Sequence, residues 1–383
     1  MKKILHIIWH SRVARAIVLV ILIIVITPTL IFSGMWVGCR SNGDGINITP
    51  NSSELKNDGQ AKEIIRNLKG YFRNEEQTYL TFPEWYIVYS AEEYATSLVK
   101  NPPSKFSYFR SVGQYWKSYC GVYSITRYNY PFNFGYHVVL FVIGGSYSIE
   151  NITKGIYENT IGRITELIST NSPTQEDIYA QKVASEYGKF IHTIPWYEFP
   201  FKDKLKGLWS ETDLFGPNFV RKWERKIILS LEYGFKSVYG WIIKGGTKTA
   251  YAPEDLEIYA IVKNLSDNIL AQNPRVRLVT RIDSEFSIIL LPRYEEFTQI
   301  VPTLTRQGVQ FVEIAGNDEI LISAIAPRDW EFKSSDANTL FSMKVLVETN
   351  FERVAIGVPI KNLHSVLSSL DSEGKKLEHI YDY

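Results

Sequence analysis

Residues 16–26 read Ala-Ile-Val-Leu-Val-Ile-Leu-Ile-Ile-Val-Ile, and the stretch without a formal charge extends from Ala16 to Cys39. About 20 apolar residues at a rise of ~1.5 Å cross the ~30 Å hydrocarbon core of a bilayer. Because backbone amides inside lipid must be paired within their own segment, we expect a transmembrane helix here. Trp9 and Trp36 lie outside its two ends, where an aromatic belt is expected.

The charges around this segment predict its orientation. The charged residues before it are all basic: Lys2, Lys3, Arg12 and Arg15. The first acidic residue of the chain is Asp44. The positive-inside rule places the N-terminus in the cytoplasm and the following chain outside. A cleaved signal peptide is the alternative, but its apolar region would be only about 7–15 residues long. Lipidation of Cys39 is disfavoured, since Trp36 stands where such cleavage sites usually carry Leu. We therefore expect an uncleaved anchor with membrane lipid around it.

Composition excludes several classes of protein. The 383 residues carry 42 Lys and Arg against 41 Asp and Glu, which argues against a cationic nucleic-acid binder. A hydrophobic content of 45% excludes intrinsic disorder. The composition then changes along the chain. We expect a basic tail and anchor at 1–40, a flexible linker at 41–60, an aromatic-rich and mainly α-helical, membrane-associated domain at 61–252, and an α+β module at 253–383.

The middle region holds most of the 20 Phe, 9 Trp and 24 Tyr. A helix is predicted over 91–99, with Ser90 as its N-cap, and it ends before Pro102 because the residue before a proline avoids helical angles. A second helix is predicted over 174–192, ending before Pro195.

Two apolar stretches, 128–149 and 227–243, leave the number of crossings open. Each could be a further membrane pass, an interfacial helix or a core helix. Four basic residues precede the later stretch, as on a cytoplasmic side: Arg221, Lys222, Arg225 and Lys226. However, a charge at the bilayer centre costs about 2.5–3.5 kcal/mol, and Glu232 and Lys236 lie within it. We favour a helical domain on or near the membrane; three passes would still leave the C-terminal module outside.

An internal echo relates these two stretches, because residues 148–157 align without gaps on residues 230–239. Each copy places a Glu and a Lys one helical turn apart, and an exposed pair of this kind merely supports its own helix. The alternative is two related helices whose glutamates face one interior and serve proton transfer or cation coordination. The candidate polar site comprises Glu150, Lys154, Tyr157, Glu232, Lys236, Tyr239 and His137.

A second echo repeats an aromatic triplet with one carboxylate. The candidate aromatic site comprises Glu84, Trp85, Tyr86, Trp196, Tyr197 and Glu198. Rings with a polar tip suit a membrane interface or a ligand cleft, and they equally suit the packing of an irregular loop.

Signatures of catalysis or cofactor binding are not found in the sequence. The six histidines form no His-Glu-x-x-His pattern or comparable ligand spacing, so we expect no metal and no cofactor. Cys120 has no partner nearby in sequence. Cys39 is its only possible disulfide mate, and we expect the two to remain unpaired.

The chain after Pro253 alternates between strands and helices. We expect a strand at 285–291, a helix at 293–307, hairpins at 309–325 and 343–358, an amphipathic helix around Leu363–Leu370 and a closing strand at 376–383. This order resembles a ferredoxin-like split βαβ sandwich with an inserted hairpin.

These patterns favour a non-enzymatic function. We expect a membrane-anchored cell-envelope protein that binds a protein partner or an apolar ligand through its aromatic middle region. The alternative is a membrane-embedded enzyme or transporter that uses the paired Glu150/Lys154 and Glu232/Lys236 helices.

Overall fold

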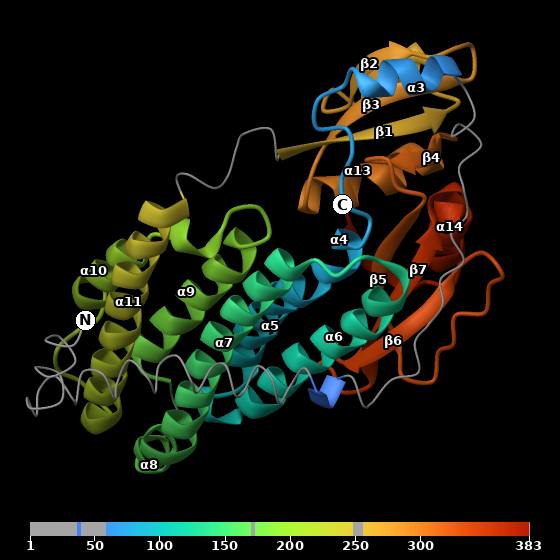
Figure 1. Ribbon diagram of the computed structural model, residues 1–383. Coiled ribbons are helices and arrows are strands. Elements are labelled where there is room, and N and C mark those ends of the chain that lie inside the picture. The colour runs from blue at the N-terminus through green and yellow to red at the C-terminus, as the bar shows by residue number, and fades with distance from the viewer. Residues whose placement is uncertain (1–36, 40–58, 170–172, 248–255, 383) are drawn as a thin grey trace, which may run out of the picture.

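The computed structural model describes residues 37–39, 59–169, 173–247 and 256–382. Nearly all of the predicted anchor and linker therefore lie outside the described residues. Along the rest of the chain a helical body comes first and two sheets follow (Figure 1). Within these ranges we find no helix with both the length and the apolarity that a membrane crossing requires.

Polar side chains cap the starts of two helices in the body. α9 (Gln175–Phe190) begins at Thr174, which forms a capping box with Asp177. α7 (Phe134–Tyr157) begins at Asn133, whose side chain accepts a hydrogen bond from the backbone of Tyr136. The other helices of the body are α3 (Gly59–Arg66), α4 (Gln77–Leu80), α5 (Phe82–Lys100), α6 (Tyr108–Asn129), α8 (Arg163–Leu167), α10 (Phe201–Ser210) and α11 (Phe219–Thr247), with short turns η2 (Pro103–Lys105), η3 (Glu158–Gly162) and η4 (Trp196–Glu198).

The predicted N-cap at Ser90 is wrong, because α5 already begins at Phe82. Tertiary contacts use the residues of the supposed capping box. The Ser90 hydroxyl lies 2.7 Å from that of Ser111, and the Glu93 carboxylate accepts from the backbone N–H of Leu346 at 2.6 Å. The predicted end of this helix before Pro102 is confirmed.

The C-terminal region forms two antiparallel four-stranded sheets with the same plan. The first has the strand order β2-β3-β1-β4 and the second β6-β7-β5-β8. The positions of β1, β2, β3 and β4 in the first sheet are therefore taken by β5, β6, β7 and β8 in the second. The strands are β1 (Glu257–Lys263), β2 (Arg277–Arg281), β3 (Phe286–Pro292), β4 (Gln310–Ile314), β5 (Glu319–Pro327), β6 (Asn338–Lys344), β7 (Phe351–Pro359) and β8 (Lys376–Tyr381).

These two sheets replace the single ferredoxin-like sandwich with an inserted hairpin that the sequence predicts. The hairpin over 309–325 is wrong, because β4 and β5 belong to different sheets and the chain between them turns through Ala315 and Gly316 at positive φ. The later hairpin is confirmed as β6 and β7, although β6 starts earlier than predicted. Three helices accompany the sheets: α12 (Asp267–Gln272), α13 (Glu295–Arg306) and α14 (Leu363–Ser372), the last after the turn η6 (Ile360–Asn362).

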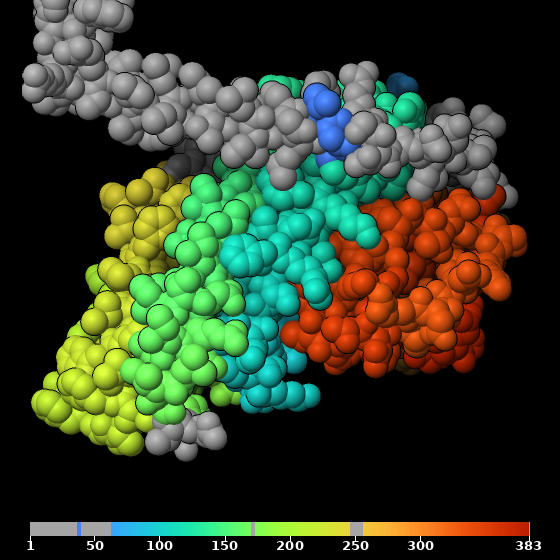
Figure 2. Space-filling view, turned by 90° about the horizontal axis from the view of Figure 1, so that it is seen from below, coloured from blue at the N-terminus to red at the C-terminus, as the bar shows by residue number. Residues whose placement is uncertain are grey.

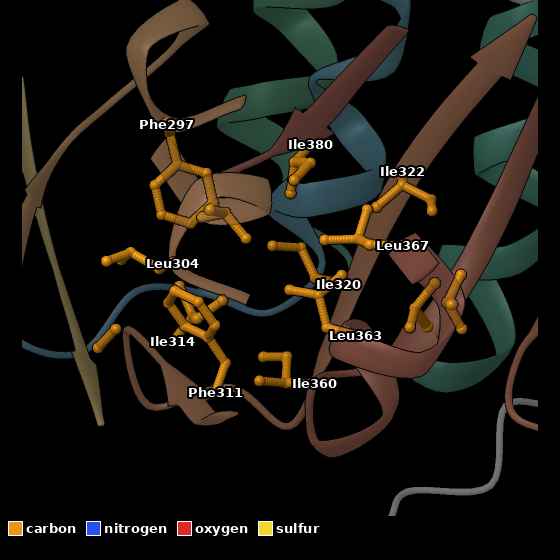
Figure 3. Packing of buried hydrophobic residues seen from close by; sticks show 14 of the residues in the cluster. Phe297, Leu304, Phe311, Ile314, Ile320, Ile322, Ile360, Leu363, Leu367 and Ile380 are labelled. Atoms are coloured by element: carbon orange, nitrogen blue, oxygen red, sulfur yellow. The ribbon is translucent and has the colours of Figure 1, made fainter. Parts of the chain in front are cut away.

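Successive side chains of β5 point to opposite faces of the second sheet, and they connect this sheet to the first sheet and to the helical body. Ile320 and Ile322 point into the core that α13 and α14 fill between the two sheets (Figure 3). Leu321 points the other way, into a cluster with Phe82 and Tyr115 of the helical body. The second sheet is therefore buried on both faces, and Figure 2 shows it lying directly against the cyan α5–α6 region. The first sheet is covered on its outer face by α3 and the residues that follow it.

Cys39 and Cys120 form a disulfide, which corrects our expectation that they stay unpaired. Their Cα atoms lie 4.9 Å apart although 81 residues separate them in sequence. Sequence proximity was the wrong criterion, because the helical segment 37–39 lies on α6 at the position of Cys120.

Candidate functional site

Four charged side chains join α7 to α11 in a ring. Lys154 Nζ lies 2.9 Å from the Glu150 carboxylate and 2.6 Å from that of Glu232. Lys236 Nζ lies 2.8 Å from Glu150 and 3.2 Å from Glu232. Each lysine thus bridges the glutamate of its own helix and that of the other. The cross-helix pairs are Glu150 with Lys236 and Lys154 with Glu232, so the two helices run antiparallel.

The ring is only partly open to solvent, and its charges stabilise one another. The exposed fraction runs from 13% for Lys236 to 40% for Glu150. Burial opposes ionisation, but Lys236 and Lys154 outweigh it and hold the pKa of Glu150 well below its ordinary value. Lys154 and Lys236 lower the pKa of Glu232 in the same way. A general acid or base works best with a pKa near the operating pH, and neither carboxylate is tuned in that direction.

The ring lines a pocket between α5, α7, α9 and α11. Its cavity of about 90 Å³ has room for a handful of waters or a small ligand group. Lys154 Nζ lies 5.6 Å from the ring centroid of Tyr94, and Lys236 Nζ lies 5.2 Å from that of Tyr187, which places cations over π faces. The aromatic part of the lining consists of Tyr94, Phe106, Tyr108, Tyr147, Tyr187, Phe201 and Tyr233.

A buried hydroxyl network adjoins this pocket. Tyr147 and Ser90 line the pocket, and the Tyr147 hydroxyl donates to Ser90 at 2.6 Å and lies 2.5 Å from the hydroxyl of Ser111. Tyr86 continues the network by donating to Gln114 at 3.0 Å. These bonds hold α5, α6 and α7 together. Single serines and tyrosines far apart in sequence carry no motif, so sequence reasoning missed the network.

Tyr157, Tyr239 and His137 do not line the pocket, although the sequence placed them with the glutamates. The Tyr157 hydroxyl donates to Glu224 at 2.5 Å, and Tyr239 bonds to a serine of α7. His137 Nδ1 lies 3.0 Å from the hydroxyl of Tyr119. Burial lowers the pKa of His137 to about 4, so this ring is neutral at pH 7.

The two aromatic triplets lie in separate surroundings. The Trp85 ring lies against the His379 ring with centroids 3.6 Å apart and planes tilted by 34°, at the contact between α5 and β8. Burial raises the pKa of Glu84 to about 7, against the opposing effects of Tyr136 and Arg293. Tyr86, the third residue of this triplet, belongs to the hydroxyl network.

The second triplet forms η4 and packs on α11. The Trp196 ring lies 5.3 Å from that of Tyr239, the Tyr197 backbone lies against Gly240, and Glu198 pairs with Lys244. The structure therefore does not join the two triplets into one aromatic cleft, and packing accounts for each of them.

A buried ionic cluster lies at the start of α11. The basic residues before the later apolar stretch pair with acidic side chains inside the body. Arg225 lies 2.8 Å from Glu158 and Lys222 lies 3.0 Å from Glu176. All four basic side chains are buried, and their acidic partners are Glu158, Glu176, Asp177 and Glu224. Glu224 lies one turn after Arg221 on α11, but the other three acids come from η3 and α9, so sequence spacing did not reveal them.

The described residues contain no group of three or more His, Cys, Asp or Glu side chains placed to hold a metal ion. Comparison with protein families, with curated proteins and with solved structures found no match.

Proposed function

We propose that this chain is a membrane-anchored protein of the cell envelope that binds a partner at the membrane without catalysis. The Cys39–Cys120 disulfide is the observation that carries the proposal. Disulfides persist in oxidising compartments and are rare in the cytosol. A disulfide in the body agrees with the orientation that the basic residues before Ala16 predict, with the N-terminus inside and the body outside.

The disulfide also supports a close attachment to the bilayer. Cys39 follows Trp36 by three residues, which is about 5 Å of helix, and Trp36 marks the outer end of the predicted anchor. The bond to Cys120 ties α6 to this point. A protein partner or an apolar ligand held by the body would then be kept at the membrane surface.

Binding through the aromatic middle region remains the proposed mode. Most of its rings pack against one another in the core, so a small ligand would have to enter the pocket beside the charge ring. The paired state of Glu150 and Glu232 supports binding over acid–base chemistry.

For the C-terminal region we propose two ferredoxin-like units in tandem. The first follows the order β-α-β-β-α-β, and the second repeats its strand order with a loop at 328–337 in place of the first helix. Folds of this type commonly serve as binding modules, and this part of the proposal rests on that analogy alone.

Cysteine labelling on intact cells tests the placement. Ser169 and Glu331 would each be replaced by Cys and treated with a membrane-impermeant maleimide. We expect both positions to react from outside. Reaction at Glu331 alone would indicate three passes, and reaction at neither position before lysis would overturn the proposal.

The alternative is a membrane-embedded enzyme or transporter, and one observation favours it: Glu150 and Glu232 meet in one pocket. The double variant Glu150→Gln/Glu232→Gln separates the two functions. If the body binds a protein partner away from this pocket, the cellular phenotype persists and only stability falls. Loss of the phenotype in a folded protein would support the alternative, with Glu331→Gln, an exposed carboxylate, as the matched control.

A further inference from the structure

The outer surface of α11 is apolar although its inner surface is charged. Between residues 227 and 242 every exposed residue of this helix is apolar: Ile227, Leu231, Phe235, Val238, Trp241 and Ile242. Leu231 is 64% and Trp241 75% exposed, so these side chains are not covered by the rest of the described chain. The charged residues Glu232 and Lys236 point the other way, into the ring.

α7 shows the same pattern, with apolar residues on its outer surface, and its exposed residues include no charge. The apolar ones recur near helical spacing: Phe134, Val138, Val139, Val142, Ile149, Ile152 and Ile156. The stripe continues through Ile161 of η3 and Ile164 of α8, which are 52% and 61% exposed.

The two stripes lie on the same side of the helix pair. Aligned residues of the internal echo are exposed alike: Ile149 with Leu231, at 71% and 64%, and Ile156 with Val238, at 55% and 60%. Because α7 and α11 run antiparallel, the symmetry that exchanges them is a twofold perpendicular to both helices. A twofold axis in this direction exchanges the two helices, and a helix surface that points along the axis stays on the same side of the pair. We call the exposed apolar residues of α7, α8 and α11 the outer face.

Other helices of the body expose charge. α9 exposes Lys182 and Lys189, and α10 exposes Lys202 and Lys206. The body is therefore apolar on one side and polar on another, with ionic pairs between. Exposed apolar patches of this size mark an interaction site, and inward-facing charges with an apolar exterior are typical of helices in contact with lipid.

The disulfide indicates which partner covers the outer face. Cys120 lies on α6, which packs directly on α7, where Trp116 Nε1 donates to Ser148 at 2.9 Å. The end of the predicted anchor is thus tied to α6, the helix that packs on α7. We propose that the outer face lies in the interfacial layer of the same bilayer that holds the anchor. This inference rests on the proposed anchoring and adds a second, peripheral contact with phospholipid.

Depth-dependent quenching in full-length protein tests the inference. Single cysteines would be introduced at Ile149, Leu231 and Val238, which are exposed enough to leave the core unchanged. Matched controls are Lys182→Cys and Lys206→Cys, and Leu22→Cys reports on the anchor. Each variant, with the native disulfide intact, carries an environment-sensitive fluorophore in vesicles of phosphatidylcholine and phosphatidylglycerol. We expect quenching by spin-labelled lipid at the three outer-face sites and at Leu22, and none at the two lysine sites.

Each other result overturns the inference in a distinguishable way. Quenching at Leu22 alone would leave the anchor in place and remove the outer face from lipid. Emission shifted to shorter wavelength at the outer face but without quenching would show that protein covers it, either residues 1–36 of this chain or a second copy. No quenching at any site, Leu22 included, would overturn the anchoring as well.

Discussion

At the scale of single residues, Gly144 of α7 packs closely against the Tyr115 ring of α6. A Cβ added there would lie 2.1 Å from the Tyr115 ring, which is fully buried and donates to the carbonyl of Leu140. We expect Gly144→Ala to lower the free energy of unfolding by about 1–3 kcal/mol in chemical denaturation. At Gly145 the added Cβ meets nothing within 4 Å, so Gly145→Ala should raise it by about 0.5–1 kcal/mol. Equal effects of the two changes would contradict this packing.

His192 is the residue for which we expect the clearest pH dependence. Its ring nitrogens lie 2.7 Å from Glu92 of α5 and 3.3 Å from Glu295 of α13. Burial disfavours the charged ring, but the bonds to Glu295 and Glu92 raise the pKa of His192 to about 9. Nearby His379 stays neutral, since burial holds its pKa well below the ordinary value.

Because the folded pKa of His192 is raised, its stabilisation is complete below the unfolded value near pH 6.5 and is lost as the pH rises through 9. We expect the free energy of unfolding to fall by about 1–3 kcal/mol over that window. Denaturation of His192→Gln at several pH values should show this slope removed. His364→Gln, on α14, should keep it; a slope that survives in His192→Gln would contradict the assignment.

At the scale of elements, the charge ring is a direct link between α7 and α11. A double-mutant cycle with Glu150→Gln and Lys236→Met should give a coupling energy of about 1–3 kcal/mol, since the pair is only partly exposed. Lys182 and Glu211 form a matched pair at 3.1 Å, with about half of each side chain exposed, and should couple by only about 0.2–1 kcal/mol. Equal coupling in the two cycles would show that the ring adds nothing beyond a surface pair.

Local signals predicted many elements but not their partners. The helix over 174–192, the helix end before Pro102 and the stripe from Leu363 to Leu370 each depend on residues close together in sequence, and the structure has them as expected. The internal echo also indicated two related helices. What the sequence could not show is that they meet, because their contact depends on α5 and α9 behind them.

The misses at this scale have the same origin. Ser90 and Glu93 fit a helix start locally, but α5 extends back to Phe82, where it packs on the second sheet. β4 and β5 flank Gly316 as hairpin strands would, yet each joins a different sheet. In both cases a long-range contact decides between conformations that the local sequence allows.

At the scale of the whole molecule, the disulfide closes a long loop. The chain-entropy model predicts a stabilisation of up to about 4–5 kcal/mol for the separation of 81 residues between Cys39 and Cys120. Reductant should therefore lower the denaturation midpoint of the full-length chain. The double variant Cys39→Ser/Cys120→Ser should start from the lower midpoint and not respond to reductant. If reductant left the denaturation midpoint of the native chain unchanged, this result would contradict the disulfide.

The predicted domain boundary at residue 253 matches a change in composition, but one hydrophobic core contains residues from both sides of it. Tyr381 of β8 lies against Phe82 of α5, and Thr78 donates to the Tyr381 carbonyl at 2.7 Å. Arg353 of β7 is buried between Glu93 of α5 and Glu378 of β8. Composition reports which residues are apolar, but it does not report which segments bury them together.

This shared core predicts that the helical body and the second sheet unfold together. Leu321 and Ile322 are neighbours on β5, both fully buried, but one contacts the helices and the other the core between the sheets. Replacing either by Ala should lower the free energy of unfolding by about 2–5 kcal/mol. If the core is continuous, Leu321→Ala and Ile322→Ala should each shift the loss of helix and the loss of sheet by the same amount, because neither part retains its buried face alone.

Far-ultraviolet circular dichroism follows the helices, and amide infrared absorption follows the sheets, in the same denaturant series. Coincident transitions in the native chain and in both variants are the expected result. Val99→Ala, at an exposed position of α5, serves as the control that should leave both midpoints in place. If Ile322→Ala moved the sheet transition and left the helical one unchanged, the two regions would be separate domains, and the contact of Leu321 with α5 and α6 would add little to stability.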